Sequence, residues 1–336
     1  MDPVSNVTGL AQVADLLQAH DHYVLVPHVA PDPDALGAVC GLAILLARLG
    51  KTVVVYTDEA VPEHCRFLGG YFPIQAKWPD ESERRWRVIF LDGGERSRLP
   101  VSVRERPIWM NLDHHEGNGC FADWIYVDTL AAATSYIVAE LLPHLGLEPD
   151  ADSASSLFAG ILFDTRGGFI TDRCTPALYR QVAQLVEAGA RPDYINRMLH
   201  EQLGMGDFKL YGEALNAIAT ALNGQIVYTS ITQAMLKASG GGEQAIEMLT
   251  LNLPKIAGGE VYILFKETPS GNFKLSFRSK GRILVNLIAK HFAGGGHRYA
   301  AGGRVEGPLA AAVPKVLLAC ELAIQEQSHV GQPASI

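Results

Sequence analysis

The chain has 336 residues, of which 48% are hydrophobic and 19% charged, and its formal net charge is −8. This length favours two domains rather than one, and the composition is that of a globular protein with full cores. A negative balance gives no global basic field, so long double-stranded nucleic acid is excluded as a partner. A short phosphorylated ligand stays open, because a few local cations and a metal ion can hold it.

The five cysteines are scattered, odd in number and without a C-x-x-C pair. They predict neither a disulfide framework nor a structural zinc site, and they favour a reducing compartment. The N-terminus lacks the basic and apolar regions of a signal peptide. No run approaches the ~18 continuous apolar residues of a membrane span. We therefore expect a cytoplasmic protein without a membrane partner.

In the N-terminal half, short apolar runs typical of strands alternate with longer helix-like segments. Strands are predicted at 23–26, 52–56, 87–91, 108–112 and 124–127, and helices at 8–18, 35–49, 134–145, 153–163 and 176–188. A strand, a helix and a strand in close succession form a βαβ unit, which implies a parallel sheet. The sequence thus predicts an α/β domain over residues 1–190, with a mainly parallel sheet flanked by helices.

A second block of strands and helices follows a change of composition around 190–215. We expect a helical linker over 191–222, because Arg191-Pro192 and the polar stretch after it are typical of a connection. Strands are then predicted at 225–231, 260–266, 273–278 and 300–305, and helices at 242–251, 284–292 and up to about 326. These segments predict a smaller C-terminal α/β domain over 223–327 and a disordered tail over 328–336.

Carboxylates and one imidazole gather in the motif H-V-A-P-D-P-D, after the first predicted strand. Two prolines keep this loop extended, so His28, Asp32 and Asp34 are presented at a defined spacing just before a helix. The alternative is that Asp34 simply caps that helix. The presence of further clusters of the same residue types favours metal ligation.

Three more clusters lie at the ends of apolar runs. Asp92 follows a predicted strand, where the alternative is a turn-forming aspartate. In Asp113-His114-His115, one imidazole could bind metal and the next meet substrate, while Asp113 orients the ligand histidine; the alternative is an exposed polar turn. Asp164 ends a buried helix, where a carboxylate needs a cation or several donors unless it caps the next segment of the chain. Carboxylates with imidazoles suit manganese, iron, zinc or magnesium.

Two motifs in the second half indicate an anion site. The run Gly294-Gly295-Gly296 lets backbone N–H groups approach an anion without a Cβ in the way, and His297 adds a donor. The alternative for the glycines is a flexible loop. The motif Arg278-Ser279-Lys280 closes a predicted strand and offers donors suited to phosphate.

In this order, H-x-x-x-D-x-D, a strand-terminal Asp, D-H-H, a later Asp, R-S-K and G-G-G-H resemble the DHH phosphoesterase superfamily with its DHH-associated C-terminal domain. The resemblance covers about residues 20–305 and is greatest to the oligoribonuclease (nanoRNase)/pAp phosphatase group. It implies an active site in the cleft between the two domains and two divalent ions, usually manganese. The implied ligands are His28, Asp32 and Asp92 for one ion and Asp34, Asp92, His114 and Asp164 for the other.

The resemblance also implies roles in catalysis and substrate binding. His115 would face the scissile phosphate, and Asp113 of the same motif is the other predicted catalytic residue. The nucleotide would be held from the second domain by Arg278, Ser279, Lys280, Gly294, Gly295, Gly296 and His297. The implied activity is hydrolysis of short oligoribonucleotides (nanoRNA), pApA or pAp to mononucleotides. Relatives in this group often form homodimers, and the sequence leaves the oligomeric state open.

Four alternatives stay open at this point. A cyclic di-AMP phosphodiesterase would share the same motifs. A pyrophosphatase-like hydrolase would lack the G-G-G-H motif and would consume pyrophosphate rather than pApA. A non-catalytic nucleotide sensor would be expected to have lost ligands, and none of the six is missing here. A long-substrate exonuclease of the RecJ type carries further DNA-binding domains and a more basic surface.

Overall fold

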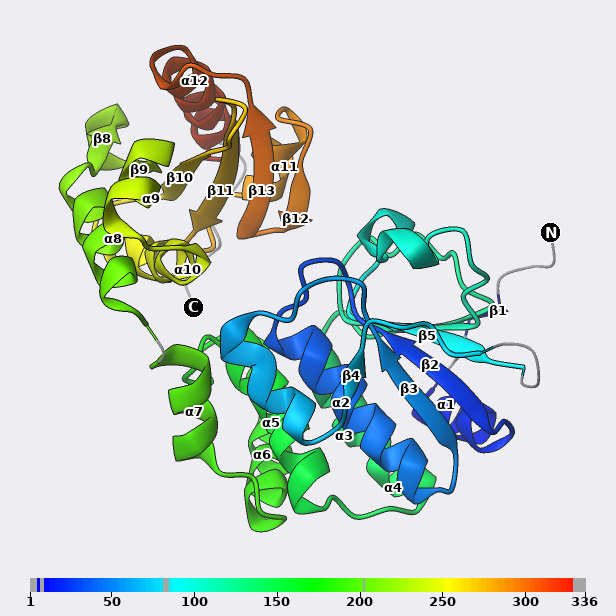
Figure 1. Cartoon of the computed structure of the whole chain (residues 1–336). Helices are drawn as coiled ribbons and strands as arrows, with labels where there is room; N and C mark the ends of the chain where they lie inside the picture. Colours follow the sequence, from blue (N-terminus) through cyan, green and yellow to red (C-terminus); the bar gives the residue numbers. More distant parts are fainter. Residues whose placement is uncertain (1–4, 7–8, 81–84, 202, 329–336) are drawn as a thin grey trace. The chain divides into compact units, whose positions relative to one another are not determined.

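The structure is a computed structural model that describes residues 5–6, 9–80, 85–201 and 203–328 (Figure 1). The chain divides into two compact units, Met1–Gln202 and Leu203–Ile336, each with its own sheet. Among the described residues, no helix has the length and apolar character needed to cross a membrane. All five cysteines are free thiols.

The N-terminal unit contains a seven-stranded sheet of order β1-β7-β6-β5-β2-β3-β4, and every described pair in it is parallel. The mainly parallel sheet expected from the sequence is therefore confirmed. Two short strands, β1 and β4, were not predicted. The strands are β1 (Ser5–Asn6), β2 (His22–Val26), β3 (Thr52–Tyr56), β4 (Ile74–Gln75), β5 (Arg87–Leu91), β6 (Met110–Asp113) and β7 (Trp124–Val127).

The helices of this unit follow the predicted positions with one division. The helix expected over 134–145 is split at Leu141, because Pro143 has no N–H with which to continue the hydrogen-bond ladder. The helices are α1 (Leu10–Gln18), α2 (Pro33–Arg48), α3 (Thr134–Glu140), α4 (Leu142–Leu145), α5 (Ala151–Asp164), α6 (Pro176–Glu187) and α7 (Pro192–His200).

Side chains along each strand point alternately to the two faces of the sheet, so each face has its own hydrophobic core. On β2, Tyr23 and Leu25 pack in the cluster that contains helices α2, α3 and α5, whereas Val24 and Val26 pack in a second cluster with the loops around Leu99. Figure 1 shows α2, α3 and α5 side by side against the sheet.

Helices α2 and α5 approach each other closely because glycine lies at their contact. A Cβ on Gly37 would lie 2.5 Å from the carbonyl oxygen of Ser156, and one on Gly41 would collide with the Leu157 side chain. The close approach holds the two helices in a fixed position relative to each other. Helix α2 begins at the proposed ligand residues Asp32 and Asp34, and α5 ends at Asp164.

The C-terminal unit contains a six-stranded mixed sheet of order β12-β13-β11-β10-β9-β8, in which only β9 and β10 are parallel among the described pairs. The expected second, smaller α/β domain is confirmed. The strands are β8 (Ala219–Ala221), β9 (Ile226–Ile231), β10 (Val261–Glu267), β11 (Phe273–Ser279), β12 (Gly295–His297) and β13 (Ala300–Val305). The helices are α8 (Met205–Asn216), α9 (Gln233–Ser239), α10 (Glu243–Asn252), α11 (Val285–Lys290) and α12 (Leu309–Ser328).

Helices cover both faces of this sheet. α11 and α12 pack on one face, and α8 and α10 pack on the other over β9 and β10. The stretch 191–222, expected as a linker, contains α7 in the first unit and α8 in the second. Helix α12 includes Ser328, and residues 329–336 of the expected tail lie outside the described residues. The expected position of the active site between the domains stays a prediction.

Candidate metal centre

The structure brings together the six side chains that the sequence marks as metal ligands. His28 follows β2, Asp92 follows β5 and His114 follows β6, and the carboxyl ends of parallel strands meet at one edge of a sheet. Helix α2 begins at the same edge and α5 ends there. Three overlapping groups of donor atoms result, each within 4.8 Å: His28, Asp32 and Asp92; Asp34, His114 and Asp164; Asp92, His114 and His115.

Asp92 joins the two halves of the cluster. Its Oδ2 lies 3.5 Å from Nε2 of His28, and its Oδ1 lies 3.5 Å from Nε2 of His114. The backbone of Asp92 has a φ of 64°, which is uncommon for a residue other than glycine and turns the chain sharply at the strand end. The hydroxyl of Thr134 donates to Oδ1 at 2.9 Å and fixes the carboxylate. The two carboxylate oxygens of the buried Asp92 therefore lie beside two different histidines, His28 and His114.

Asp32 has two tasks at once. Its Oδ1 caps helix α2 by accepting hydrogen bonds from the backbone N–H groups of Asp34 and Ala35, each at 3.0 Å. Its Oδ2 lies 3.5 Å from Nε2 of His28. The capping that the sequence left open for Asp34 therefore belongs to Asp32, and it leaves one oxygen for a ligand.

Asp34 is buried against the N-terminus of helix α3. Its Oδ2 accepts from the backbone N–H of Thr134 at 2.7 Å, and its Oδ1 accepts from that of Ser135 at 2.9 Å. A helix N-terminus favours negative charge, so α3 holds and orients this carboxylate. A Cβ on Gly160 of α5 would lie 2.6 Å from Oδ1, so only glycine lets α5 pass this close.

Both ligand histidines present Nε2 to the cluster. Nδ1 of His114 lies 3.3 Å from the carbonyl oxygen of Ala131, and Nδ1 of His28 lies 2.8 Å from that of Val29. A ring that donates its Nδ1–H to a carbonyl keeps the lone pair of Nε2 for a cation. Nε2 of His114 also lies 3.2 Å from Oδ2 of Asp164, the last residue of α5.

The imidazoles lie in a strongly negative environment. Burial lowers the pKa of His28, but Asp32 and Asp92 outweigh it and raise the pKa to about 10. Burial likewise lowers the pKa of His114, but Asp164 and then Asp92 outweigh it and raise this pKa to about 10. The cluster therefore attracts positive charge, which protons or metal ions can provide.

The carboxylates show the same crowding. Burial, followed by the charges of Asp92 and Asp164, raises the pKa of Asp34 well above its usual range. Burial would also raise the pKa of Asp92, but His28 and the other histidines outweigh it and hold it far below its usual range. So many buried carboxylates require compensating cations. Oxygen and imidazole donors in this proportion fit hard or borderline divalent ions.

Asp113 orients His115 rather than His114. Its Oδ1 lies 2.8 Å from Nδ1 of His115 and accepts from the backbone N–H groups of His114 and His115 at 2.9 and 3.2 Å. We expected Asp113 to orient the ligand histidine; instead the ring of His114 contacts the carbonyl of Ala131, because Asp113 ends strand β6 and points toward the second imidazole. The His115 side chain remains 26% exposed.

Two asparagines that the sequence analysis missed extend this network. Nδ2 of Asn118 donates to Oδ1 of Asn111 at 2.6 Å and to Oδ2 of Asp113 at 2.9 Å. Nδ2 of the buried Asn111 donates to the carbonyls of Phe90 and Gly93, which flank Asp92. The network thus couples the turn that carries Asp92 to the residue that orients His115.

Arg173, between α5 and α6, was also missed. Its Nη1 lies 3.4 Å from Nδ1 of His114 and 3.4 Å from the carbonyl oxygen of Ala131. It places a permanent positive charge beside the ring of His114. No motif marks Arg173, because the contact depends on how the segment after α5 folds back.

In the C-terminal unit, register brings two of the predicted substrate-binding residues together. Arg278 of β11 and His297 of β12 both pair with Ala300 of the intervening strand β13, so the two side chains lie on the same face. Gly295 is exposed, and a Cβ there would have nothing within 4 Å. That position is open to a ligand.

The other glycines of the run are required by the fold itself. A Cβ on Gly294 would collide with the carbonyl oxygen of Gly302, and one on Gly296 would lie 2.7 Å from that of Ala300. Gly296 also has a φ of 135°, which L side chains rarely adopt. The run is thus part of a strand pair, β12 with β13, rather than a flexible loop.

The sequence predicted that Ser279 and Lys280 bind substrate, but their side chains contact other groups of the protein. Ser279 is buried on the opposite face, because it is next to Arg278 in a strand, and its hydroxyl donates to the carbonyl of Ile283 at 2.6 Å. Nζ of Lys280 donates to the carbonyl of Ile256 at 2.7 Å and lies 5.3 Å above the ring of Tyr262. The fold engages both side chains.

Comparison with known proteins decides the family. Residues 22–163 match the DHH family, N-terminal domain, and residues 223–326 match the DHHA1 domain. The chain is 31% identical over 299 residues to the bifunctional oligoribonuclease and PAP phosphatase NrnA of Thermus thermophilus, and the match covers 88% of each protein. The chain belongs to the DHH family.

Further relatives of this DHH-family chain agree with that assignment. It is 25% identical over 298 residues to the bifunctional oligoribonuclease and PAP phosphatase NrnA of Bacillus subtilis, with 86% of this chain and 91% of the relative covered. A crystal structure of an exopolyphosphatase-related protein from Bacteroides fragilis has the same fold, with a TM-score of 0.83 at 22% identity over 98% of this chain and 99% of that one. The resemblance carried by the ordered motifs is confirmed.

Proposed function

We propose that this protein is a phosphoester hydrolase that cleaves short oligoribonucleotides, pApA and pAp to mononucleotides with the help of two divalent ions. The position of Asp92 carries the proposal: its two carboxylate oxygens lie 3.5 Å from Nε2 of His28 and 3.5 Å from Nε2 of His114. One carboxylate between two donor groups suits a pair of adjacent ions. The names of the Thermus and Bacillus relatives support the substrate class.

The donor groups suggest how the ions are shared. When bound, the ions would generate hydroxide from water near neutral pH and neutralise charge on the phosphoryl group. Manganese is the metal we propose, since carboxylates outnumber imidazoles. The proposed ligands are His28, Asp32 and Asp92 for one ion and Asp34, Asp92, His114 and Asp164 for the other.

The remaining residues would position the substrate and its protons. Asp113 holds Nδ1 of His115 and so orients the ring, which would donate a hydrogen bond to a phosphoryl oxygen as charge develops there. The backbone N–H groups of Thr134 and Ser135 keep the Asp34 carboxylate fixed throughout. Such preorganised groups need no rearrangement at the moment of reaction.

In the second unit, Arg278 and His297 would hold a phosphate of the nucleotide, and Gly295 would let it approach the backbone. The proposal also includes a cytoplasmic location, in keeping with five free thiols. It includes a homodimer as the assembly, which sedimentation of the purified protein would test.

The test is hydrolysis by metal-depleted protein with and without added manganese. The substrates are pAp, pApA, a ladder of 5′-phosphorylated RNAs, cyclic di-AMP and pyrophosphate. We expect manganese-dependent release of mononucleotides from pApA and the short RNAs. Hydrolysis that persists after chelation would contradict the proposal, preference for pyrophosphate would favour a pyrophosphatase, and nucleotide binding without hydrolysis would favour a sensor.

A matched pair of variants tests the ligand assignment. Asp92→Asn keeps the shape of the side chain but removes its charge, and we expect activity to fall by at least about 100-fold, because even outer-shell changes at metal sites cost 10–100-fold. Asp123→Asn is the control, since Asp123 is exposed. Equal activity of the two variants would refute the role of Asp92.

A further inference from the structure

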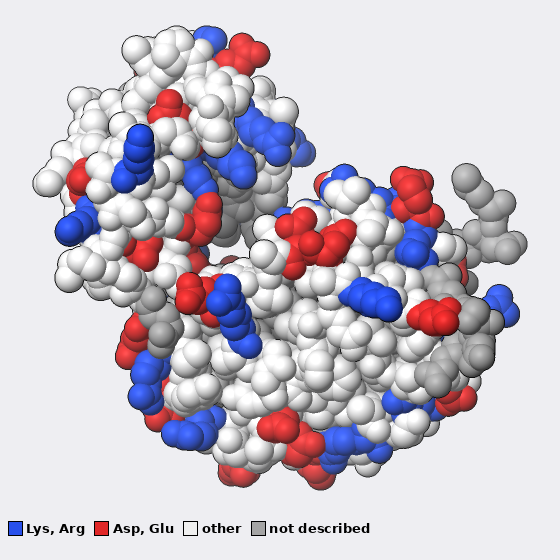
Figure 2. Space-filling model, in the orientation of Figure 1, with Lys and Arg blue, Asp and Glu red and all other residues white. Residues whose placement is uncertain are grey.

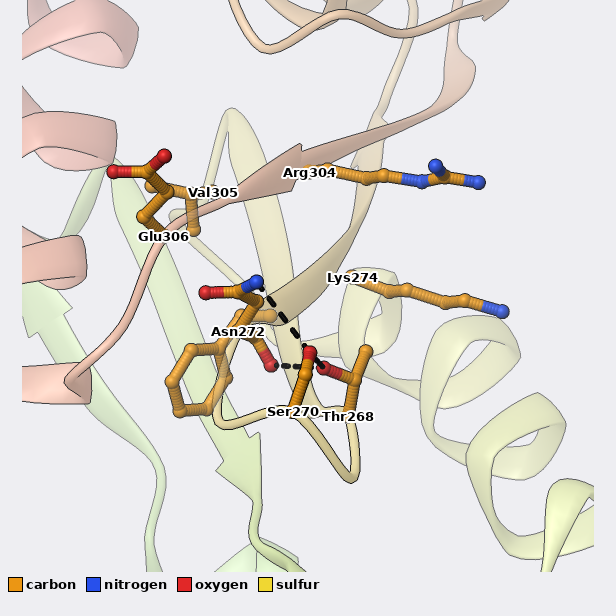
Figure 3. Close-up of a pocket in the computed structure, with 8 residues that line it drawn as sticks. Thr268, Ser270, Asn272, Lys274, Arg304, Val305 and Glu306 are labelled. Carbon is orange, nitrogen blue, oxygen red and sulfur yellow. Dashed lines mark hydrogen bonds between the residues drawn. The ribbon is translucent and has the colours of Figure 1, made fainter.

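Two basic side chains lie together on the sheet of the C-terminal unit, away from Arg278 and His297. Lys274 of β11 is directly opposite Arg304 of β13, and both side chains are exposed. Figure 3 shows the two extending side by side in one direction, away from Glu306. In the part of the chain that the structure describes, neither side chain forms an ion pair or a hydrogen bond. Two unneutralised cations at this spacing suit an anion.

A third cation lies in the same row across the sheet, but a carboxylate neutralises its charge. Lys266 of β10 is directly opposite Lys274, but its ammonium group is paired with the carboxylate of Glu243 at the start of helix α10. The row therefore crosses three strands, and its last two members, Lys274 and Arg304, are left for a ligand. Figure 2 shows basic side chains gathered on the part of this unit that carries β12 and β13.

The pair lies on the same face as the predicted nucleotide site. Lys274 and Arg278 are four residues apart on one strand, so their side chains point the same way. At ~3.4 Å per residue their backbones are about 14 Å apart. The face between them is formed by small residues, Ser276 of β11 and Gly302 of β13, which are also directly opposite each other. Small side chains between the two basic positions leave room for a chain molecule to bridge them.

Two hollows that Lys274 lines offer space for the rest of such a ligand. A hollow of about 290 Å³ is bordered by Lys274, Arg304 and the polar turn Thr268–Asn272 (Figure 3). A second hollow of about 250 Å³ also contacts Lys274 and is lined by Leu236, Ile246 and Gln233, among others. The mixture of apolar and polar groups suits a sugar or a base next to a phosphate.

We propose that Lys274 and Arg304 bind a backbone phosphate of an oligoribonucleotide, at a position separate from the phosphate held by Arg278 and His297. The inference rests on the proposed function and sharpens its substrate class. A separation of about 14 Å corresponds to roughly two to four nucleotides, since a stacked strand rises ~3.4 Å per nucleotide and an extended one rises more. The pair would therefore favour RNAs of several nucleotides over pAp.

The test compares two substrates in the full-length protein with manganese. The variant Lys274→Gln/Arg304→Gln removes both charges and keeps polar side chains at both positions. We expect the ratio of kcat/KM for a 5′-phosphorylated pentaribonucleotide to that for pAp to fall about tenfold, mainly through KM. The salt dependence of KM for the pentaribonucleotide should also become shallower, because fewer counterions are released on binding.

The control variant is Lys290→Gln/Lys315→Gln, which removes two exposed charges from α11 and α12 on the other face of the same sheet. It should leave both the ratio and the salt dependence as in the wild type. An unchanged ratio in the Lys274/Arg304 variant would overturn the inference while wild-type hydrolysis of both substrates upholds the proposed function. Failure of the wild type to hydrolyse either substrate would overturn the proposed function itself.

Discussion

Gly160 of helix α5 lies so close to Asp34 of helix α2 that a Cβ on the glycine would be 2.6 Å from the carboxylate oxygen Oδ1. The same Cβ would collide with the hydroxyl of Ser135, whose backbone N–H holds that oxygen. Helix packing and the position of a proposed metal ligand therefore depend on one residue without a side chain. Nothing around Gly160 in the sequence marks it for this role.

Replacing Gly160 with alanine should destabilise the fold and impair the site together. Overpacking at a close contact costs roughly 1–3 kcal/mol of unfolding free energy, and displacement of Asp34 should lower manganese affinity. Urea unfolding and calorimetric titration of manganese would measure both. Gly212→Ala in helix α8 is the control, because a Cβ there has nothing within 4 Å and alanine in a helix should stabilise by ~0.4–1 kcal/mol. A Gly160→Ala protein as stable as wild type would show that the contact is not tight.

Asn118→Ala should lower kcat more than it alters KM. The variant loses the hydrogen bonds to Asn111 and Asp113, so His115 is held less firmly. Loss of such an orienting partner typically costs 10–100-fold in activity. Steady-state kinetics on pApA would measure the effect, with Asn196→Ala as the control, since Asn196 bonds only to the exposed Glu201 among the described residues. An equal effect of both variants would mean that the network does not act on His115.

Two glycine variants separate folding from ligand binding in the G-G-G-H motif. Gly295→Ala should leave the thermal midpoint as in wild type, because its Cβ enters open space, and should raise KM for pAp about tenfold by blocking close approach of a phosphate. Gly294→Ala should instead lower the thermal midpoint, because its Cβ meets the carbonyl of Gly302. Wild-type KM in Gly295→Ala would argue against a phosphate at this position.

The stability contributed by Asp150 should depend on pH. Burial raises the pKa of this carboxyl, but hydrogen bonds from Ser153 and the charge of Arg48 outweigh it and lower the pKa below its usual range. A group with a lowered folded pKa stabilises the protein above its unfolded pKa of roughly 3.9 and loses that contribution as pH falls through the folded pKa.

Asp150 also caps helix α5, which ends at Asp164, so Asp150→Ala should cost about 1 kcal/mol of unfolding free energy at pH 7. The difference from wild type should narrow as the pH falls below ~4. Urea unfolding at several pH values would measure it, with the exposed Asp172→Ala as the control. A difference that does not change with pH would assign the effect to the backbone rather than to the charge.

Much of the fold was predictable because its signals are local. The buried parallel strands are short runs of β-branched and apolar residues, and the helices have their own periodicity and stop signals, so their order alone implies a parallel α/β unit. The two-residue strands β1 and β4 and the three-residue strand β12 carry no such signal. They exist because a neighbouring strand offers unpaired backbone groups at that position.

Part of the site was likewise predictable from the sequence, whereas the orientation of other side chains depends on the tertiary structure. His28, Asp92 and the D-H-H motif were found because strand ends place polar residues beside apolar runs, and the chain order of the motifs is distinctive. Ser279 and Lys280 were assigned to a ligand because a sequence does not show which face a side chain takes. Register places Ser279 in the core, while Arg278 beside it faces out.

The sequence by itself determined the residue types of a metal site, the parallel α/β order and the family, since each of these is written in local pattern and spacing. Only the tertiary structure decided which atoms meet: Asp113 with His115, Thr134 and Ser135 with Asp34, and Lys274 with Arg304. The physical reason is that these contacts join segments, or faces of one segment, whose relative position is fixed by packing and hydrogen-bond register across the whole sheet.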